Sequence, residues 1–109
     1  MPNSKYRLEY LPTFYEDLEE TSTYISVELH NVKAANDLID AIEKAIIERL
    51  PFAESFEPYP SKYERKHTYY RIYIDNYEVY YVVIDEGNGN KVMEVRRLLY
   101  KGKDKSRLI

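Results

Sequence analysis

The residues of this sequence best suited to chemistry lie in its last third. Arg71 and Glu78 flank a two-residue turn predicted at Asp75-Asn76, and an adjacent pair of arginines, Arg96 and Arg97, follows in the next β-rich run. Guanidinium groups bind phosphates and other oxyanions through paired hydrogen bonds. Two arginines around a carboxylate are therefore consistent with an anion-binding groove. They are equally consistent with an ion-pair network across neighbouring strands of a solvated sheet.

Other kinds of catalytic or metal site lack the residues that they need. The chain has no cysteine, two histidines (His30 and His67) and three glycines, all of which occur late in the sequence. These counts argue against a thiolate or histidine-rich metal site, a cysteine nucleophile and a glycine-rich phosphate loop. We therefore expect no metal ion and no small-molecule cofactor.

Length and charge place the chain among small globular proteins. Its 109 residues fit one domain, spanning residues 1–109, and no apolar stretch approaches the roughly 20 residues of a membrane span. The N-terminus lacks the apolar run of a secretory signal, so we expect a cytoplasmic protein. The net charge is −3, with five basic and eleven acidic residues in 1–56 but eleven basic and eight acidic residues in 57–109. The acidic pI, about 5.4, argues against non-specific nucleic-acid binding, for which a strongly basic domain is expected.

The first half of the chain predicts a strand and two helices. Residues 6–10 alternate apolar and charged side chains, which indicates a half-buried strand. Thr13 and Glu16 have the spacing of a capping box, so a helix is expected over residues 14–29. Asn31 is suited to cap a second helix, which ends before Pro51 and carries the clearest apolar stripe of the sequence. Two helices joined so closely form an antiparallel hairpin.

The second half predicts three antiparallel strands. From Thr68 the apolar period changes to two, which places strands at 68–74, 77–84 and 91–99, after an irregular connection over residues 52–65. From Tyr100 onward the chain is a polar, basic extension. The order β-α-α-β-β-β predicts an α+β fold, an antiparallel sheet with the helical hairpin packed on one face.

The two-residue turn fixes which residues share a face of this sheet. The face expected to meet the helices carries Tyr70, Ile72, Ile74, Tyr77, Val79 and Tyr81. The opposite, open face carries Tyr69, Arg71, Tyr73, Glu78 and Tyr80. In one register of the last strand, Met93, Val95 and Leu99 meet the helices while Glu94 and Arg96 face outward; in the other, Arg97 lies opposite Glu78. A bulge would switch between the two, and in either register one arginine of the pair is expected near Glu78 and Arg71.

Tyrosine is unusually frequent, at thirteen residues. Its ring fills a core while its hydroxyl remains available at a wet edge. The excess fits either a small sheet with tyrosine-rich faces or a surface that stacks bases or grips a peptide. Composition alone leaves both open.

The sequence resembles the RelE/ParE toxins, the toxic halves of bacterial type II toxin–antitoxin modules. The resemblance is carried by the element order, the opening stretch 6–12, the stretch 70–81 and the ending 92–104. It implies a RelE/ParE-like fold and a protein that inhibits growth until its cognate antitoxin neutralises it, as in plasmid stabilisation. The remaining alternative is a non-toxic protein-binding or dimerisation module.

The resemblance also implies two possible targets. RelE-like members cut mRNA on the ribosome, and ParE-like members poison DNA gyrase. By position, Arg71 matches a basic residue on the second strand of the cleaving enzymes, and Arg97 and Tyr100 lie near their late arginine and C-terminal tyrosine or histidine. These three are the candidate catalytic residues of a possible ribosome-dependent endoribonuclease. Glu78 stands where the cleaving members have an arginine, and this difference favours DNA gyrase as the target. His67 matches no catalytic base of the family.

Overall fold

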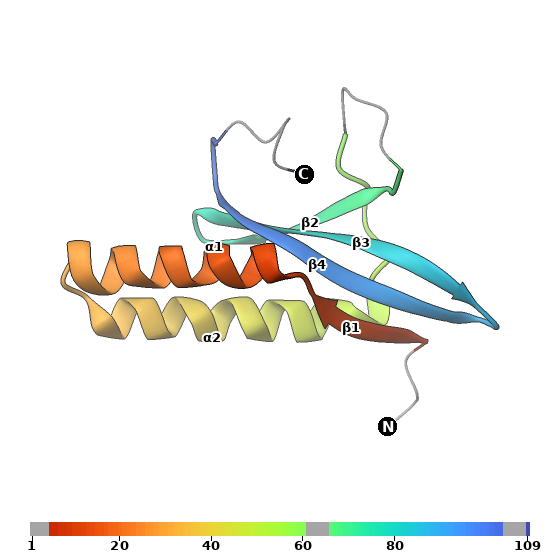
Figure 1. Ribbon diagram of the computed structural model, residues 1–109, viewed down its shortest axis with the longest axis horizontal. Helices are drawn as coiled ribbons and strands as arrows, with labels where there is room; N and C mark the ends of the chain where they lie inside the picture. Colours follow the sequence, from red (N-terminus) through yellow and green to blue (C-terminus); the bar gives the residue numbers. More distant parts are fainter. Residues whose placement is uncertain (1–4, 61–65, 104–108) are drawn as a thin grey trace.

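The structure is a computed structural model that describes residues 5–60, 66–103 and 109 (Figure 1). The expectations for residues 1–4, for part of the connection before the second strand (61–65) and for most of the basic extension (104–108) lie outside these ranges. In Figure 1 the two helices run side by side, and the sheet lies against them and extends beyond their ends.

The elements follow the expected order. They are β1 (Tyr6–Tyr10), α1 (Pro12–Thr23), a π-helical turn (Tyr24–Glu28), α2 (Val32–Arg49), a 3-10 turn (Leu50–Phe52), β2 (Tyr69–Ile74), β3 (Tyr77–Gly87) and β4 (Asn90–Tyr100). The strands form one sheet in the order β1-β4-β3-β2. The α+β fold is confirmed, but the sheet is mixed, because β1 pairs with β4 in parallel. Alternation along a strand predicts which face is buried, not which strand lies beside it or in which direction, so the parallel pair was not predicted.

The two helices begin in different ways. α1 starts at Pro12, whose missing N–H costs nothing at the first helical position, and its N-cap residue Leu11 makes no side-chain cap. The Thr13 hydroxyl instead donates to the carbonyl oxygen of Arg96 at 2.9 Å, so the predicted capping box is wrong. The cap of α2 is confirmed, because Asn31 Oδ1 accepts from the backbone N–H of Ala34 at 2.9 Å.

The end of the first helix also differs from the expectation. The chain is α-helical only to Thr23, continues through the π-helical turn and then reverses at His30, which has a positive φ of 51°. The N–H of Leu29 bonds to the Tyr24 carbonyl and the N–H of Asn31 to the Ile25 carbonyl, both at 3.1 Å. These bonds satisfy carbonyls that a helix end leaves unpaired.

The main core lies between the helices and one face of the sheet. Among its most buried members are Phe14, Ile42, Ile46, Val79, Tyr81, Met93 and Val95. Each large apolar side chain buried in this way contributes about 1.5–3 kcal/mol. The hydroxyl of Tyr81 donates to the Ala53 carbonyl oxygen at 2.7 Å and accepts from Arg49 at 2.9 Å, which permits a tyrosine in a wholly buried position. The predicted helix-facing residues of β2 and β3 are therefore confirmed.

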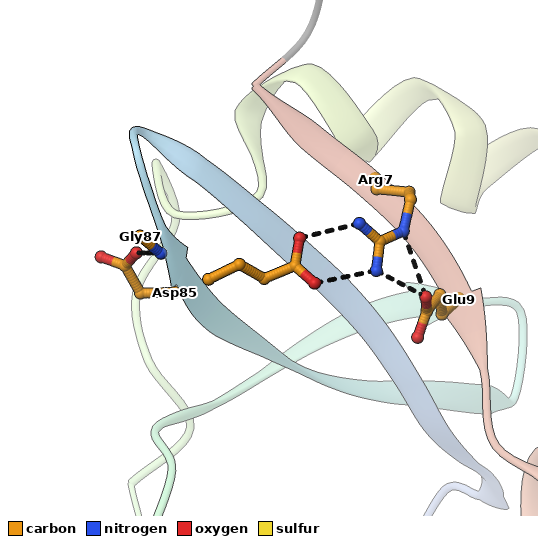
Figure 2. Close-up of polar contacts among 5 residues, drawn as sticks. Arg7, Glu9, Asp85 and Gly87 are labelled. Carbon is orange, nitrogen blue, oxygen red and sulfur yellow. Dashed lines mark hydrogen bonds and ion pairs between the residues drawn. The ribbon is translucent and has the colours of Figure 1, made fainter.

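An ion-pair network lies on the other side of the sheet. Arg7 of β1 donates to both carboxylate oxygens of Glu86 on β3, at 2.7 and 2.9 Å. It also donates to Glu9 on its own strand, as Figure 2 shows. The contact with Glu86 crosses the intervening strand β4 and connects the parallel strand β1 to strand β3. Because these side chains are largely exposed, the network contributes little to the stability of the fold.

Candidate functional site

The face of the sheet turned away from the helices, called the open face below, is built by a register that the sequence predicted. β2 and β3 pair Arg71 with Tyr80 and Tyr73 with Glu78. Directly paired residues project to the same side of an antiparallel pair. Arg71, Tyr73, Glu78 and Tyr80 therefore share the open face.

A β-bulge decides where the paired arginines go. Tyr81 lies opposite Val95 and Tyr80 lies opposite Arg97, so Arg96 is the extra residue in β4. Before the bulge, the register follows the alternative in which Met93 and Val95 meet the core. After it, the alternation shifts by one, so that Leu99 rather than Arg97 lies opposite Glu78. The expectation that Leu99 faces the helices is wrong for the same reason.

The first polar group on this face is the Arg71 cluster (Arg71, Glu78 and Tyr80). The Tyr80 hydroxyl donates to Glu78 Oε1 at 2.9 Å, and Arg71 Nη1 lies 4.0 Å from Glu78 Oε2. Glu78 is only 4% exposed, and the Arg71 guanidinium lies over the rings of Tyr59 and Tyr73, 4.9 and 5.0 Å from their centroids. Arg71 is thus held by a carboxylate and two aromatic rings.

The second group is the Arg96 cluster (Arg96, Glu94 and Tyr69). Arg96 Nε donates to Glu94 Oε1 at 2.7 Å and its Nη1 donates to the Tyr69 hydroxyl at 2.9 Å. The bulge turns Arg96 towards Tyr69 and Glu94. The arrangement repeats the first cluster, with one arginine, one glutamate and one tyrosine.

Arg97 lies opposite Tyr80 in the register, but its guanidinium reaches α1. Its Nε and Nη2 donate to the two carboxylate oxygens of Asp17 on α1, at 2.7 and 2.8 Å, and Asp17 also accepts from the backbone N–H of Leu98 at 3.0 Å. In these bonds Arg96 binds Glu94 and Arg97 binds Asp17, and neither binds Glu78. The two arginines therefore do not form the expected arginine–glutamate–arginine cluster with Glu78. Asp17 was missed because nothing near it in the sequence signals a partner in the last strand.

Tyr100 lies on the opposite side of the sheet from Arg71. It pairs with Tyr77 at the end of β4, and the two rings meet edge to face with centroids 5.4 Å apart. Tyr77 packs against the main core, so Tyr100 is on the helix side. Both tyrosines line a groove of about 820 Å³ between the helices and the end of the sheet, together with Asp17, Glu20, Thr21, Tyr24, Ile25, Leu29, Ala34, Asn76, Leu98, Leu99 and Lys103.

Part of the open face is covered rather than hollow. Tyr69, Tyr80, Val82 and Leu99 form a second buried cluster, against which Tyr59, Ile84 and Ile109 pack. The Tyr59 ring lies edge-on to Tyr80 at 5.3 Å, and its backbone N–H bonds to the Tyr69 carbonyl at 2.7 Å. The open face expected from the sequence is thus partly covered by residues that the periodicity of the strands could not place. Tyr73, at 61% exposure, remains in solvent beside Arg71.

The electrostatics fit arginines that are held in place. Burial alone would lower the pKa of Arg71. The hydrogen bond to Tyr80 and the neighbouring Tyr73 and Glu78 outweigh this effect, so that the pKa of Arg71 is raised above its usual value. For Arg97, the hydrogen bond to Asp17 is the main cause of a raised pKa. Burial chiefly raises the pKa of Tyr80, so this hydroxyl stays protonated at neutral pH. None of these groups is poised to accept a proton there.

The described residues contain no group of three or more acidic, histidine or cysteine side chains that would hold a metal ion. Across these same ranges, none of the helices has both the length and the apolar character needed to cross a membrane.

The fold, a helical hairpin on one face of a four-stranded mixed sheet, is of the α+β class and is consistent with the toxins of the RelE/ParE type. A sequence model of one family of this type, described as the ParE toxin of the type II toxin–antitoxin system parDE, matches residues 8–104. The match covers most of the chain, and the chain belongs to the ParE toxin family. It is the toxin component of a type II toxin–antitoxin system, and its family implies an antitoxin partner. A comparison with curated proteins found no significant match.

Proposed function

We propose that this toxin acts on DNA gyrase and does not cut mRNA. The observation that carries the proposal is that the three residues a cleaving enzyme would use do not converge. Arg71 is on the open face, Arg97 is bound to Asp17 on α1, and Tyr100 is on the helix side of the sheet beside Tyr77.

Cleavage of RNA by its own 2′-hydroxyl makes demands that this arrangement meets poorly. A group must accept the hydroxyl proton, and cations must stabilise the charge that develops on the phosphate. Glu78 is the carboxylate that lies beside Arg71, and its oxygens are engaged by Tyr80 and Arg71. A tyrosine such as Tyr100, with an ordinary pKa near 10, is a weak base at neutral pH.

Ribosome-dependent cleavage by Arg71, Arg97 and Tyr100 is the second candidate. It is favoured by the pairing of Arg71 with an exposed aromatic ring, Tyr73, a combination that suits unpaired bases. It would require Arg97 to leave Asp17 when the target binds.

Induction of the chain in a bacterial host separates the candidates. Gyrase poisoning predicts DNA breaks, a strong SOS response and intact transcripts. mRNA cleavage predicts cut transcripts in primer extension, and loss of the cuts in Arg97→Ala and Tyr100→Phe. Cut transcripts without an SOS response would overturn the proposal. Normal growth with soluble protein present would favour the non-toxic binding module.

We further propose that the antitoxin covers the groove beside Tyr100. The groove has an apolar floor that includes Ile25 and Leu98, and two of its wall residues, Tyr24 and Leu29, are each more than half exposed. Exposed apolar side chains gathered around a concavity are typical of a protein-binding surface. An antitoxin segment that folds on contact would bury them.

A further inference from the structure

On the open face, Arg71 and Arg96 are each matched with a glutamate at a neighbouring position of the sheet. Arg71 lies beside Glu78, and Arg96 is bonded to Glu94. We propose that Glu78 and Glu94 determine the specificity of this toxin, because they keep the phosphates of single-stranded RNA away from Arg71 and Arg96. The proposal rests on the proposed function, in which RNA is not the target.

Both glutamates are placed to compete with a phosphate. Glu78 is almost wholly buried and is fixed by the Tyr80 hydroxyl, so it does not swing away from Arg71 at little cost. Glu94 is also mostly buried and binds the Nε of Arg96 at 2.7 Å. A phosphate that approached either arginine would have to displace a tethered carboxylate, and it would be repelled by that carboxylate if both remained.

The rest of the Arg71 cluster would suit RNA. The guanidinium lies over the exposed ring of Tyr73 and over the ring of Tyr59. Aromatic rings interleaved with arginines are the means by which proteins bind single strands, through base stacking and backbone contacts. The carboxylate is therefore the feature of this cluster that opposes RNA binding, and its charge is the property to remove.

The test measures binding of a fluorescein-labelled, ten-nucleotide single-stranded RNA by fluorescence anisotropy, over a series of salt concentrations. Glu78→Gln keeps the shape and the acceptor for Tyr80 but removes the charge. We expect about tenfold tighter binding than for the wild type, as one charge-assisted phosphate contact would provide. The slope of log K against log salt should become steeper by about 0.7, which corresponds to one phosphate of a single strand.

Three further variants make the result specific. Arg71→Gln combined with Glu78→Gln should return the affinity to the wild-type value, because the freed arginine is gone. Asp40→Asn, an equal change of charge at an exposed position of α2, should bind RNA like the wild type. Glu94→Gln tests the same idea at Arg96 and remains available if Glu78→Gln does not fold, as judged by circular dichroism.

The proposal is overturned if neither glutamine variant binds RNA more tightly than Asp40→Asn, or if the wild type already binds as tightly as Glu78→Gln. These outcomes are independent of gyrase inhibition by the wild type. A gain of RNA affinity in a protein that does not inhibit gyrase would refute the proposed function and support this inference. Gyrase inhibition by the wild type, with no gain of RNA affinity in the glutamine variants, would support the proposed function and refute this inference.

Discussion

Replacement of Asp17 should destabilise the fold through Arg97 and β4. The Asp17 carboxylate accepts three hydrogen bonds, two from Arg97 and one from the Leu98 backbone, and the two side chains are only 15% and 21% exposed. Removal of one partner of a buried ion pair costs about 3–5 kcal/mol. Because both groups keep some contact with water, we expect about 2 kcal/mol for Asp17→Asn. We expect about 3 kcal/mol for Asp17→Ala, which also leaves the Leu98 N–H without its acceptor.

Urea denaturation followed by circular dichroism measures this effect. A loss of about 2 kcal/mol moves the midpoint by about 1 M for a domain of this size, and it is a large share of a total stability of about 5–15 kcal/mol. Glu19→Gln, an exposed position of the same helix, is the matched control and should change little. A double-mutant cycle with Arg97→Gln should give a coupling energy of at least about 1 kcal/mol. Coupling below about 0.3 kcal/mol, or an Asp17→Asn midpoint equal to that of the wild type, would refute the structural role given to Arg97.

Three further predictions concern other parts of the chain. His30→Gly should stabilise the fold by about 0.5–1 kcal/mol in the same urea assay, because His30 has a positive φ at a helix end, and His30→Ala should give no such gain. The hydrogen bond from Lys91 is the main reason for the lowered pKa of Glu54, so Glu54→Gln should lower the thermal midpoint above about pH 5. This deficit should shrink as the pH falls through the lowered pKa of the folded carboxyl, and a deficit that stays the same over the whole acid range would contradict the assignment. Leu29→Asp should weaken antitoxin binding at least tenfold in isothermal titration calorimetry, whereas Ile47→Asp, equally exposed but outside the groove, should not; equal losses would show that the groove is not the site.

The sequence predicted the features that depend on local chemistry. The cap at Asn31, the apolar stripe of α2 and the pairing of Arg71 with Tyr80 all follow from residue type and spacing over a few positions. The capping box at Thr13 was wrong because a proline at the first helical position begins α1 without a side-chain cap, and the hydroxyl binds a strand carbonyl instead.

The features that it did not predict depend on distant parts of the chain. The parallel pairing of β1 with β4, the covering of Tyr80 by Tyr59 and the bond between Asp17 and Arg97 have no local signal. The bulge at Arg96 was foreseen as a possibility. Its position decided the candidate site, because Arg96 became the extra residue of β4 and Arg97 came to lie opposite Tyr80 instead of Glu78.

The most direct test of the central claim is an assay of DNA supercoiling and cleavage with purified gyrase, relaxed plasmid, ATP and the purified toxin. The proposed function predicts that supercoiling falls and that linear, gyrase-linked DNA accumulates as the toxin is added. It also predicts that equimolar antitoxin abolishes both effects. Unchanged supercoiling and no cleaved DNA at a toxin concentration that arrests growth in cells would contradict it.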